Sequence, residues 1–105
     1  MIKNKDEAKS LFENYDITEA LKNDEPHDII HEIADDEVDI YTQDRFEWLA
    51  KDNNYYVLED AVDEFGFPER DGKPDFVQAV ALAQYKANEN LLWEAWEQVK
   101  EANND

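Results

Sequence analysis

The fold is decided by residues 75–100, DFVQAVALAQYKANENLLWEAWEQVK. Asp75 is a good N-terminal cap, and the stretch behind it predicts one long helix that reaches about Lys100. At about 1.5 Å per residue such a helix spans roughly 40 Å, which is the length of a whole small domain. Its first half, Phe76 to Asn88, contains no acidic residue and only one lysine, Lys86. We therefore expect this helix to be the strut on which the rest of the chain packs.

Three short helices are predicted before residue 37. The first covers Asp6 to Asn14, and the second runs from about Asp16, in a capping-box pattern, to Asn23. Asp24 is expected to cap the third, with a proline in its first turn. The side chains expected to face inward on the first and third helices are apolar and recur at helical spacing: Ala8, Leu11 and Phe12, then Ile29, Ile30, Ile33 and Ala34.

Two more helices are predicted, over residues 37–52 and from Tyr55 to Phe65, the latter ending at Gly66. Residues 66–74 hold both glycines and two of the three prolines, which predicts a loop. The fold class is thus all-α: a single domain in which about five short-to-medium helices pack as a compact bundle on one long C-terminal helix. Within this domain, near-neutral N-terminal helices are predicted for residues 1–23 and acidic helices for residues 24–65. A loop is predicted for residues 66–74 and the long helix for residues 75–101. The inward faces of the two helices are predicted to be Val38, Tyr41, Arg45, Trp48 and Leu49, and Tyr55, Leu58, Ala61, Val62 and Phe65.

The charge of the chain is its most unusual property. It has 28 acidic and 10 basic residues, a net charge of −18, whereas a small soluble domain needs a magnitude of only about 2–8. Leu, Ile, Val and Phe supply 24 of the 105 residues, just above the level at which so charged a chain stays disordered. We therefore expect a folded protein whose carboxylates repel one another. The sign of the charge excludes direct binding to nucleic acid or to an anionic membrane.

The absence of cysteine excludes disulfides, a thiolate nucleophile and a cysteine metal site. No apolar region of the signal-peptide type follows the N-terminal lysines, and no apolar run approaches the ~20 residues of a membrane span. A cytoplasmic protein is the expectation.

Two patterns resemble metal sites. His27 and His31 lie at the i, i+4 spacing of zinc-protease helices, but Asp stands in place of the general-base Glu, and histidines bonded to neighbouring acids are the expectation. The acidic run from Asp35 is similar to a calcium loop, yet Ile40 and Phe46 occupy the positions that need Gly and Glu. We predict no metal site and no cofactor.

Close acidic pairs such as Asp44 with Glu47 and Asp60 with Glu64 suit general acid–base chemistry. Among 28 acids such pairs arise by chance. Ser10, the only serine, has no partner pattern, and no phosphate-binding glycine loop is present. No catalytic residue is predicted, and the chain is not expected to be an enzyme.

The acidic residues are concentrated rather than spread. Residues 24–64 carry 15 acids and two bases, whereas residues 1–23 carry five acids and four lysines. Carboxylates at i, i+3, i+4 and i+7 recur every ~5–6 Å along a helix, and DNA carries one charge per ~3.4 Å on each strand. Two acidic faces together can therefore imitate a duplex. The carboxylates predicted to imitate phosphates and bind a partner are Asp24, Glu25, Asp28, Glu32, Asp35, Asp36, Glu37, Asp39, Asp44, Glu47, Glu59, Asp60, Asp63 and Glu64.

The chain also resembles the phage antirestriction DNA mimics of the Ocr type. The resemblance lies in an ungapped run and in a second patch on the long helix: His27-Asp28, Ile30-His31, Ala34-Asp35, Val38, Tyr41, Asp44 and Ala50, then Tyr85, Leu92-Trp93-Glu94 and Glu97. It implies an all-helical homodimer that occupies the DNA-binding groove of type I restriction-modification enzymes in a bacterial host cell. Residues 52–74 depart from the family pattern, and its strongly acidic C-terminal tail is missing, so the target and the dimer geometry stay open.

Two alternatives remain from the residues alone. An acidic adaptor would bind a basic host or phage protein without imitating DNA, and duplex DNA would then not displace it. A halophilic protein would carry acidic residues for solubility in high salt, although its charge should be spread evenly.

Overall fold

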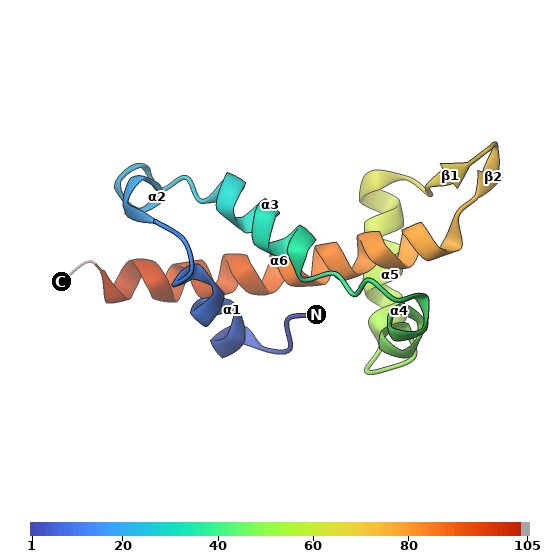
Figure 1. The fold of residues 1–105 in the computed structure, drawn as a ribbon, viewed down its shortest axis with the longest axis horizontal. Helices are drawn as coiled ribbons and strands as arrows, with labels where there is room; N and C mark the ends of the chain where they lie inside the picture. The colour runs from blue at the N-terminus through green and yellow to red at the C-terminus, as the bar shows by residue number, and fades with distance from the viewer. Residues whose placement is uncertain (104–105) are drawn as a thin grey trace. The chain divides into compact units, whose positions relative to one another are not determined.

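The computed structural model of the protein describes residues 1–103. In this range the order of elements is α1 (Lys5–Phe12), α2 (Thr18–Asn23), α3 (His27–Asp36), α4 (Thr42–Leu49), α5 (Asn54–Phe65), β1 (Glu69–Arg70), β2 (Lys73–Pro74) and α6 (Phe76–Ala102) (Figure 1). The predicted all-α class with one long C-terminal helix is confirmed. Asp75 caps α6 as predicted, because its Oδ1 accepts a hydrogen bond of 3.0 Å from the backbone N–H of Gln78.

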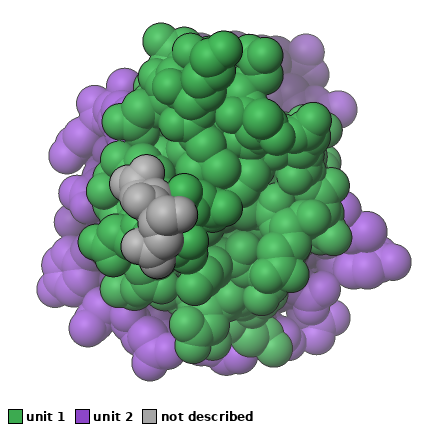
Figure 2. Space-filling view, turned by 90° about the vertical axis from the view of Figure 1, so that its left-hand side faces the viewer, with its two compact units in different colours: residues 1–37, 88–105 green, residues 38–87 purple. Residues whose placement is uncertain are grey.

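The chain divides into two compact units, coloured separately in Figure 2. Unit 1 comprises residues 1–37 and 88–105, and unit 2 comprises residues 38–87. Helix α6 contributes to both, since the division falls within it. In the described part of the chain, no helix is long and apolar enough to cross a membrane.

The core of unit 1 forms where α1 and α3 contribute apolar side chains against the second half of α6. Phe12 and Trp96 are almost fully buried, and their ring centroids lie 5.5 Å apart. Asn88 is completely buried; its Nδ2 donates to the Ala34 carbonyl at 3.0 Å, and its Oδ1 accepts from the Ile2 N–H at 3.1 Å. A buried amide is tolerated because both of its ends are hydrogen-bonded.

The core of unit 2 forms between α5 and the first half of α6. Leu58 and Ala61 pack with Ala79 and Ala83, and partly buried residues of α4 and α5 surround them: Trp48, Leu49, Val57 and Val62. The inward residues predicted for the fifth helix are correct for Leu58, Ala61 and Val62.

Asp24 does not cap the third helix, contrary to the prediction. It ends α2 instead, with a left-handed backbone (φ 52°), and α3 begins three residues later after Pro26. Its carboxylate binds α6: Trp96 Nε1 donates to Oδ1 at 3.2 Å, and Lys100 Nζ lies 3.2 Å from the same oxygen. The side chain of Asp24 suits an N-cap, but in the folded protein it binds donors from α6 instead.

The prediction of a helix over residues 37–52 is too long, because residues 38–41 are not helical. The side chain of Gln84, fully buried in α6, replaces the helical hydrogen bonds there: it accepts from the Asp39 N–H at 3.1 Å and donates to Asp39 Oδ2 at 3.0 Å. Arg45 Nε donates to the Asp39 carbonyl at 2.7 Å. Tyr41, which was predicted to face inward, is 66% exposed.

Smaller differences concern helix ends and the loop. Helix α1 begins after Asn4, whose side chain caps it, and α2 begins at Thr18 rather than near Asp16. Within the predicted loop, residues 69–70 and 73–74 pair as an antiparallel hairpin. Asp71 and Gly72 form its turn, both at positive φ (54° and 78°), which is the Asp-Gly signature of a two-residue hairpin loop.

Candidate protein-binding surface

Helix α3 presents the acidic face of unit 1. Its buried side chains, Ile30, Ile33 and Ala34, point into the core, and helical periodicity turns the acidic positions to the other side. All the carboxylates on that side are exposed: Asp28, Glu32, Asp35 and Asp36. They follow one another at i, i+4, i+7 and i+8, so a single partner surface can contact all of them.

Some of the carboxylates at this end of the chain segment affect the pKa of a nearby tyrosine, Tyr15. Burial raises the pKa of the Tyr15 hydroxyl above its ordinary value, and the negative charges of Glu32, Asp36 and Glu37 raise the pKa further. Three carboxylates from one helix end thus act on one hydroxyl group. The negative charge of this part of α3 therefore acts on a side chain outside the helix.

Helix α5 presents the corresponding acidic face of unit 2. Leu58 and Ala61 are buried on its inner side, and the acids on its outer side are all exposed: Glu59, Asp60, Asp63 and Glu64. Glu64 forms an ion pair with Lys86 of α6. Asp44 and Glu47 of α4 are also exposed, and Gln43 Nε2 donates to Glu47 Oε1 at 3.0 Å.

Of the fourteen predicted carboxylates, twelve are exposed, and Glu37 and Asp39 are half-buried. Asp24 is exposed yet serves the fold as well. The pKa of Asp24 lies below its ordinary value, mainly because of the hydrogen bond from Trp96 and next because of the hydrogen bond from Lys100. Asp39 Oδ2 accepts a hydrogen bond from Gln84 Nε2. These two carboxylates are therefore less available to a partner than the acids on α3 and α5.

Each of the two histidines contacts a side chain of α6. The His27 ring lies edge-on to the Trp93 ring, with centroids 5.0 Å apart, and His31 Nε2 lies 3.5 Å from Glu89 Oε2. The contact of His31 agrees with the expectation of a histidine beside an acid. Trp93 is half-buried and contacts His27, whereas Trp96 lies in the core. Among residues 1–103, no group of three His, Cys, Asp or Glu side chains is placed to hold a metal ion.

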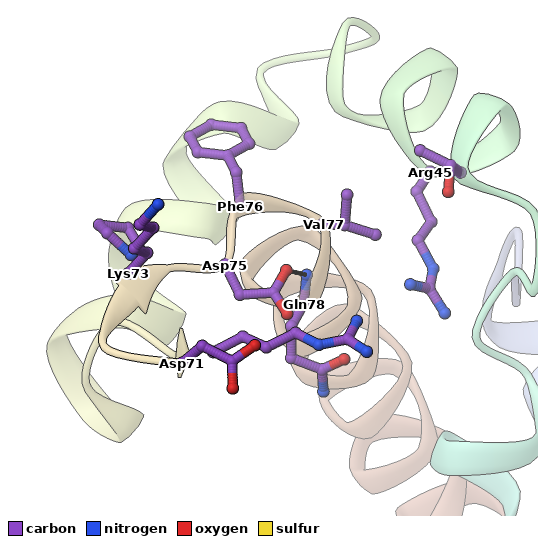
Figure 3. A pocket seen from close by; sticks show the side chains of 10 residues that line it. Arg45, Asp71, Lys73, Asp75, Phe76, Val77 and Gln78 are labelled. Atoms are coloured by element: carbon purple, nitrogen blue, oxygen red, sulfur yellow. Dashed lines mark hydrogen bonds between the residues drawn. The ribbon is translucent and has the colours of Figure 1, made fainter.

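A hollow of about 740 Å³ in unit 2 contains three of the basic residues of the chain. Its lining includes both arginines and one lysine, but also two carboxylates: Arg45, Arg70, Lys73, Asp71 and Asp75, with Thr42, Pro74, Phe76, Val77 and Gln78. In Figure 3, Asp71 and Asp75 stand between Arg45 and Lys73, whose charged groups do not converge. Because the charges are mixed and dispersed, this hollow lacks the geometry of an anion site.

Exposed aromatic residues in unit 2 were missed by the periodicity argument. Tyr55 and Phe65 were predicted to face inward, but they are 56% and 46% exposed. Phe76 stacks on Phe46, with centroids 6.0 Å apart and an interplanar angle of 11°, and lies 6.1 Å from Phe67. The Asp-Gly turn was the available signal, since the register of a two-residue hairpin, continued two residues beyond its strands, places Phe67 opposite Phe76.

Scans of the chain against protein-family models, curated proteins and solved structures found no match.

Proposed function

We propose that the protein is a non-catalytic DNA mimic that occupies the DNA-binding groove of an enzyme, with a type I restriction-modification enzyme as the favoured target. The observation that carries the proposal is the placement of exposed carboxylates along the outer faces of α3 and α5, each opposite a buried apolar face. The resemblance to Ocr-type proteins supports the choice of target and of a homodimer.

The physical basis is electrostatic complementarity. A groove that binds DNA presents lysines and arginines to rows of phosphates, and rows of carboxylates at helical spacing offer it the same sign and a similar spacing. Exposed carboxylates remain hydrated until the partner arrives, so many weak contacts add up to the affinity. Such binding releases counterions and weakens steeply as salt rises, as DNA binding does.

The test is competition. A purified type I restriction enzyme is titrated with the protein while a fluorescent duplex reports on the occupied groove. We expect displacement of the duplex, relief of inhibition by excess DNA, and a logarithm of the binding constant that falls linearly with the logarithm of salt concentration. Simultaneous binding of duplex and protein would overturn the proposal. Ultracentrifugation of the free protein tests the homodimer separately.

The second candidate, an acidic adaptor for a basic protein, is favoured by one observation. Aromatic rings stand exposed among the carboxylates of unit 2, including Tyr55 and Tyr56, and exposed aromatic side chains are typical of small binding hot spots. Duplex DNA would not displace an adaptor from its partner, so the same competition experiment separates the two functions.

A further inference from the structure

A second hollow in unit 2, of about 540 Å³, combines aromatic walls with carboxylates. It is lined by Tyr55, Leu58, Glu59, Val62, Asp63, Phe67 and Phe76. Leu58 is buried at its base, while Tyr55, Phe67 and Phe76 are 56%, 39% and 47% exposed. The volume is in the range of pockets that bind small molecules or single side chains. Apolar surface that stays open at such a place commonly marks a binding site.

The aromatic wall is held in position by the hairpin. The backbone N–H of Asp75 donates to the Pro68 carbonyl at 2.8 Å, which closes the base of the hairpin and brings the neighbouring residues Phe67 and Phe76 together. Their ring centroids lie 6.1 Å apart, and Phe46 also stacks on Phe76, with centroids 6.0 Å apart. A ligand would therefore meet rings that are already ordered, which lowers the entropic cost of binding.

The charge of the hollow selects a cation. Glu59 and Asp63 lie one turn apart on α5, both are exposed, and both line the hollow. No lysine or arginine is among the described residues that line it. A cation placed there would find carboxylates and ring faces together, and each of these attracts positive charge.

We propose that this hollow, the aromatic–acidic pocket, binds an arginine side chain of the partner, whose guanidinium stacks on an exposed ring and pairs with Glu59 and Asp63. Arginine is preferred to lysine because its planar group stacks on aromatic faces, forms two parallel bonds to a carboxylate and is more weakly hydrated. The inference rests on the proposed function, since it names the group of the DNA-binding groove that α5 receives. A phosphate offers no ring, so at this point the protein would bind an arginine better than DNA does.

The chain offers matched controls for a test. Tyr56 is 62% exposed and adjacent to Tyr55, but it does not line the pocket. As a charge control, Glu13→Gln/Glu101→Gln changes two exposed acids outside residues 24–64 and removes the same charge as Glu59→Gln/Asp63→Asn.

The experiment titrates the full-length chain with N-acetyl-arginine amide, its lysine analogue and its neutral citrulline analogue at constant ionic strength. NMR shifts of the Tyr55 and Phe76 rings are recorded. We expect the arginine compound to bind best, Glu59→Gln/Asp63→Asn to weaken it about tenfold or more, and Tyr55→Ala to weaken it about two- to fivefold. Tyr56→Ala and Glu13→Gln/Glu101→Gln should stay within about twofold of the wild type.

Equal binding of arginine and citrulline, or of arginine and lysine, would overturn the assignment, as would equal losses in the pocket and control variants. The outcome is separable from that of the proposed function. If the arginine compound binds as expected but duplex DNA is not displaced from the enzyme, the pocket stands and DNA mimicry fails. If DNA is displaced but the pocket variants inhibit as well as their controls, mimicry stands and the arginine pocket fails.

Discussion

Removing the acidic face of α3 should weaken inhibition more than removing the same charge elsewhere. The variant changes the four exposed acids of that face to amides: Asp28→Asn, Glu32→Gln, Asp35→Asn and Asp36→Asn. The matched control changes four exposed acids outside residues 24–64: Glu13→Gln, Glu69→Gln, Glu94→Gln and Glu101→Gln. Each variant removes four negative charges and brings the net charge from −18 to −14. The two therefore differ in where the charge lies and not in how much remains.

The magnitude follows from the exposure of the four side chains. Solvent-exposed ion pairs are worth about 0.2–1 kcal/mol each, so four of them give about 0.8–4 kcal/mol, or a loss of affinity between about fourfold and nearly a thousandfold. The acids are neighbours on one helix and will not add strictly. The control should lose about twofold or less, because its acids lie outside the proposed contact surface.

The fold should survive the α3 variant. Its acids at i, i+3 and i+4 repel one another by about 0.2–0.5 kcal/mol per pair, and removing them relieves that repulsion. One contribution opposes this, since Asp28 lies in the first turn, where a negative charge is favourable by about 0.3–1 kcal/mol. The melting temperature should therefore stay within a few degrees of the wild type, about 4–8 °C corresponding to 1 kcal/mol in a domain of this size.

The assay is displacement of a fluorescent duplex from the enzyme, with thermal unfolding as the check on folding. Equal losses in the α3 variant and its control would show that only total charge matters, and the imitation of a duplex by a helix face would be wrong. An α3 variant that inhibits like the wild type would remove α3 from the contact surface.

Two further predictions concern the fold that positions this surface. Asn88→Ala should lower the free energy of unfolding by about 1–4 kcal/mol, because it leaves the Ile2 N–H and one bond of the Ala34 carbonyl unsatisfied in the core; a urea titration that shows no loss would contradict this. Asp24→Asn should destabilise the protein by a constant amount from neutral pH down to about the ordinary Asp pKa of 3.8, and by less below it. The reason is that the hydrogen bond from Trp96 lowers the folded-state pKa of Asp24, so the wild-type advantage is lost only as pH falls through that lowered value; a difference in melting temperature that does not change with pH would refute the argument.

The positions of α3, α5 and α6 could be predicted because their own residues determine them. Ile30, Ile33 and Ala34 recur at helical spacing, Gly66 ends α5, and Asp75 begins α6. The exposure of the acids then followed, since helical periodicity places them opposite the apolar stripe. The acidic faces of the candidate surface could thus be predicted from the sequence.

The failures occur where distant residues compete for a segment. Asp24 has the chemistry of an N-cap, but Trp96, 72 residues away, takes its carboxylate. Residues 38–41 have a helical pattern, but Gln84 supplies hydrogen bonds to Asp39 from 45 residues away. Neither partner can be identified from local propensity, because the contact exists only after the helices have packed.

The aromatic–acidic pocket escaped prediction for a different reason. Tyr55 lies at the start of α5, where its periodicity with Leu58 and Val62 fits an inward face, yet no element within residues 1–103 covers that end of the helix enough to bury it. Periodicity gives the direction of a side chain and not what stands in front of it. The pocket runs along α5 from Tyr55 to Asp63, and its remaining wall consists of Phe67 and Phe76, which the hairpin brings together.

The distribution of charge along the chain follows from the role of α6 in both cores. Residues 76–88 carry no acid, and the buried polar side chains there, Gln84 and Asn88, are neutral amides with hydrogen-bond partners. A carboxylate at either position would have to lose its hydration without a cation to pair with, at a cost of several kcal/mol. The acids lie instead on exposed faces, among them the outer faces of α3 and α5, whose opposite apolar faces are buried. Under the proposed function, each acidic face is held by its own buried apolar side, and it would lose less binding free energy in ordering itself than a flexible acidic chain would.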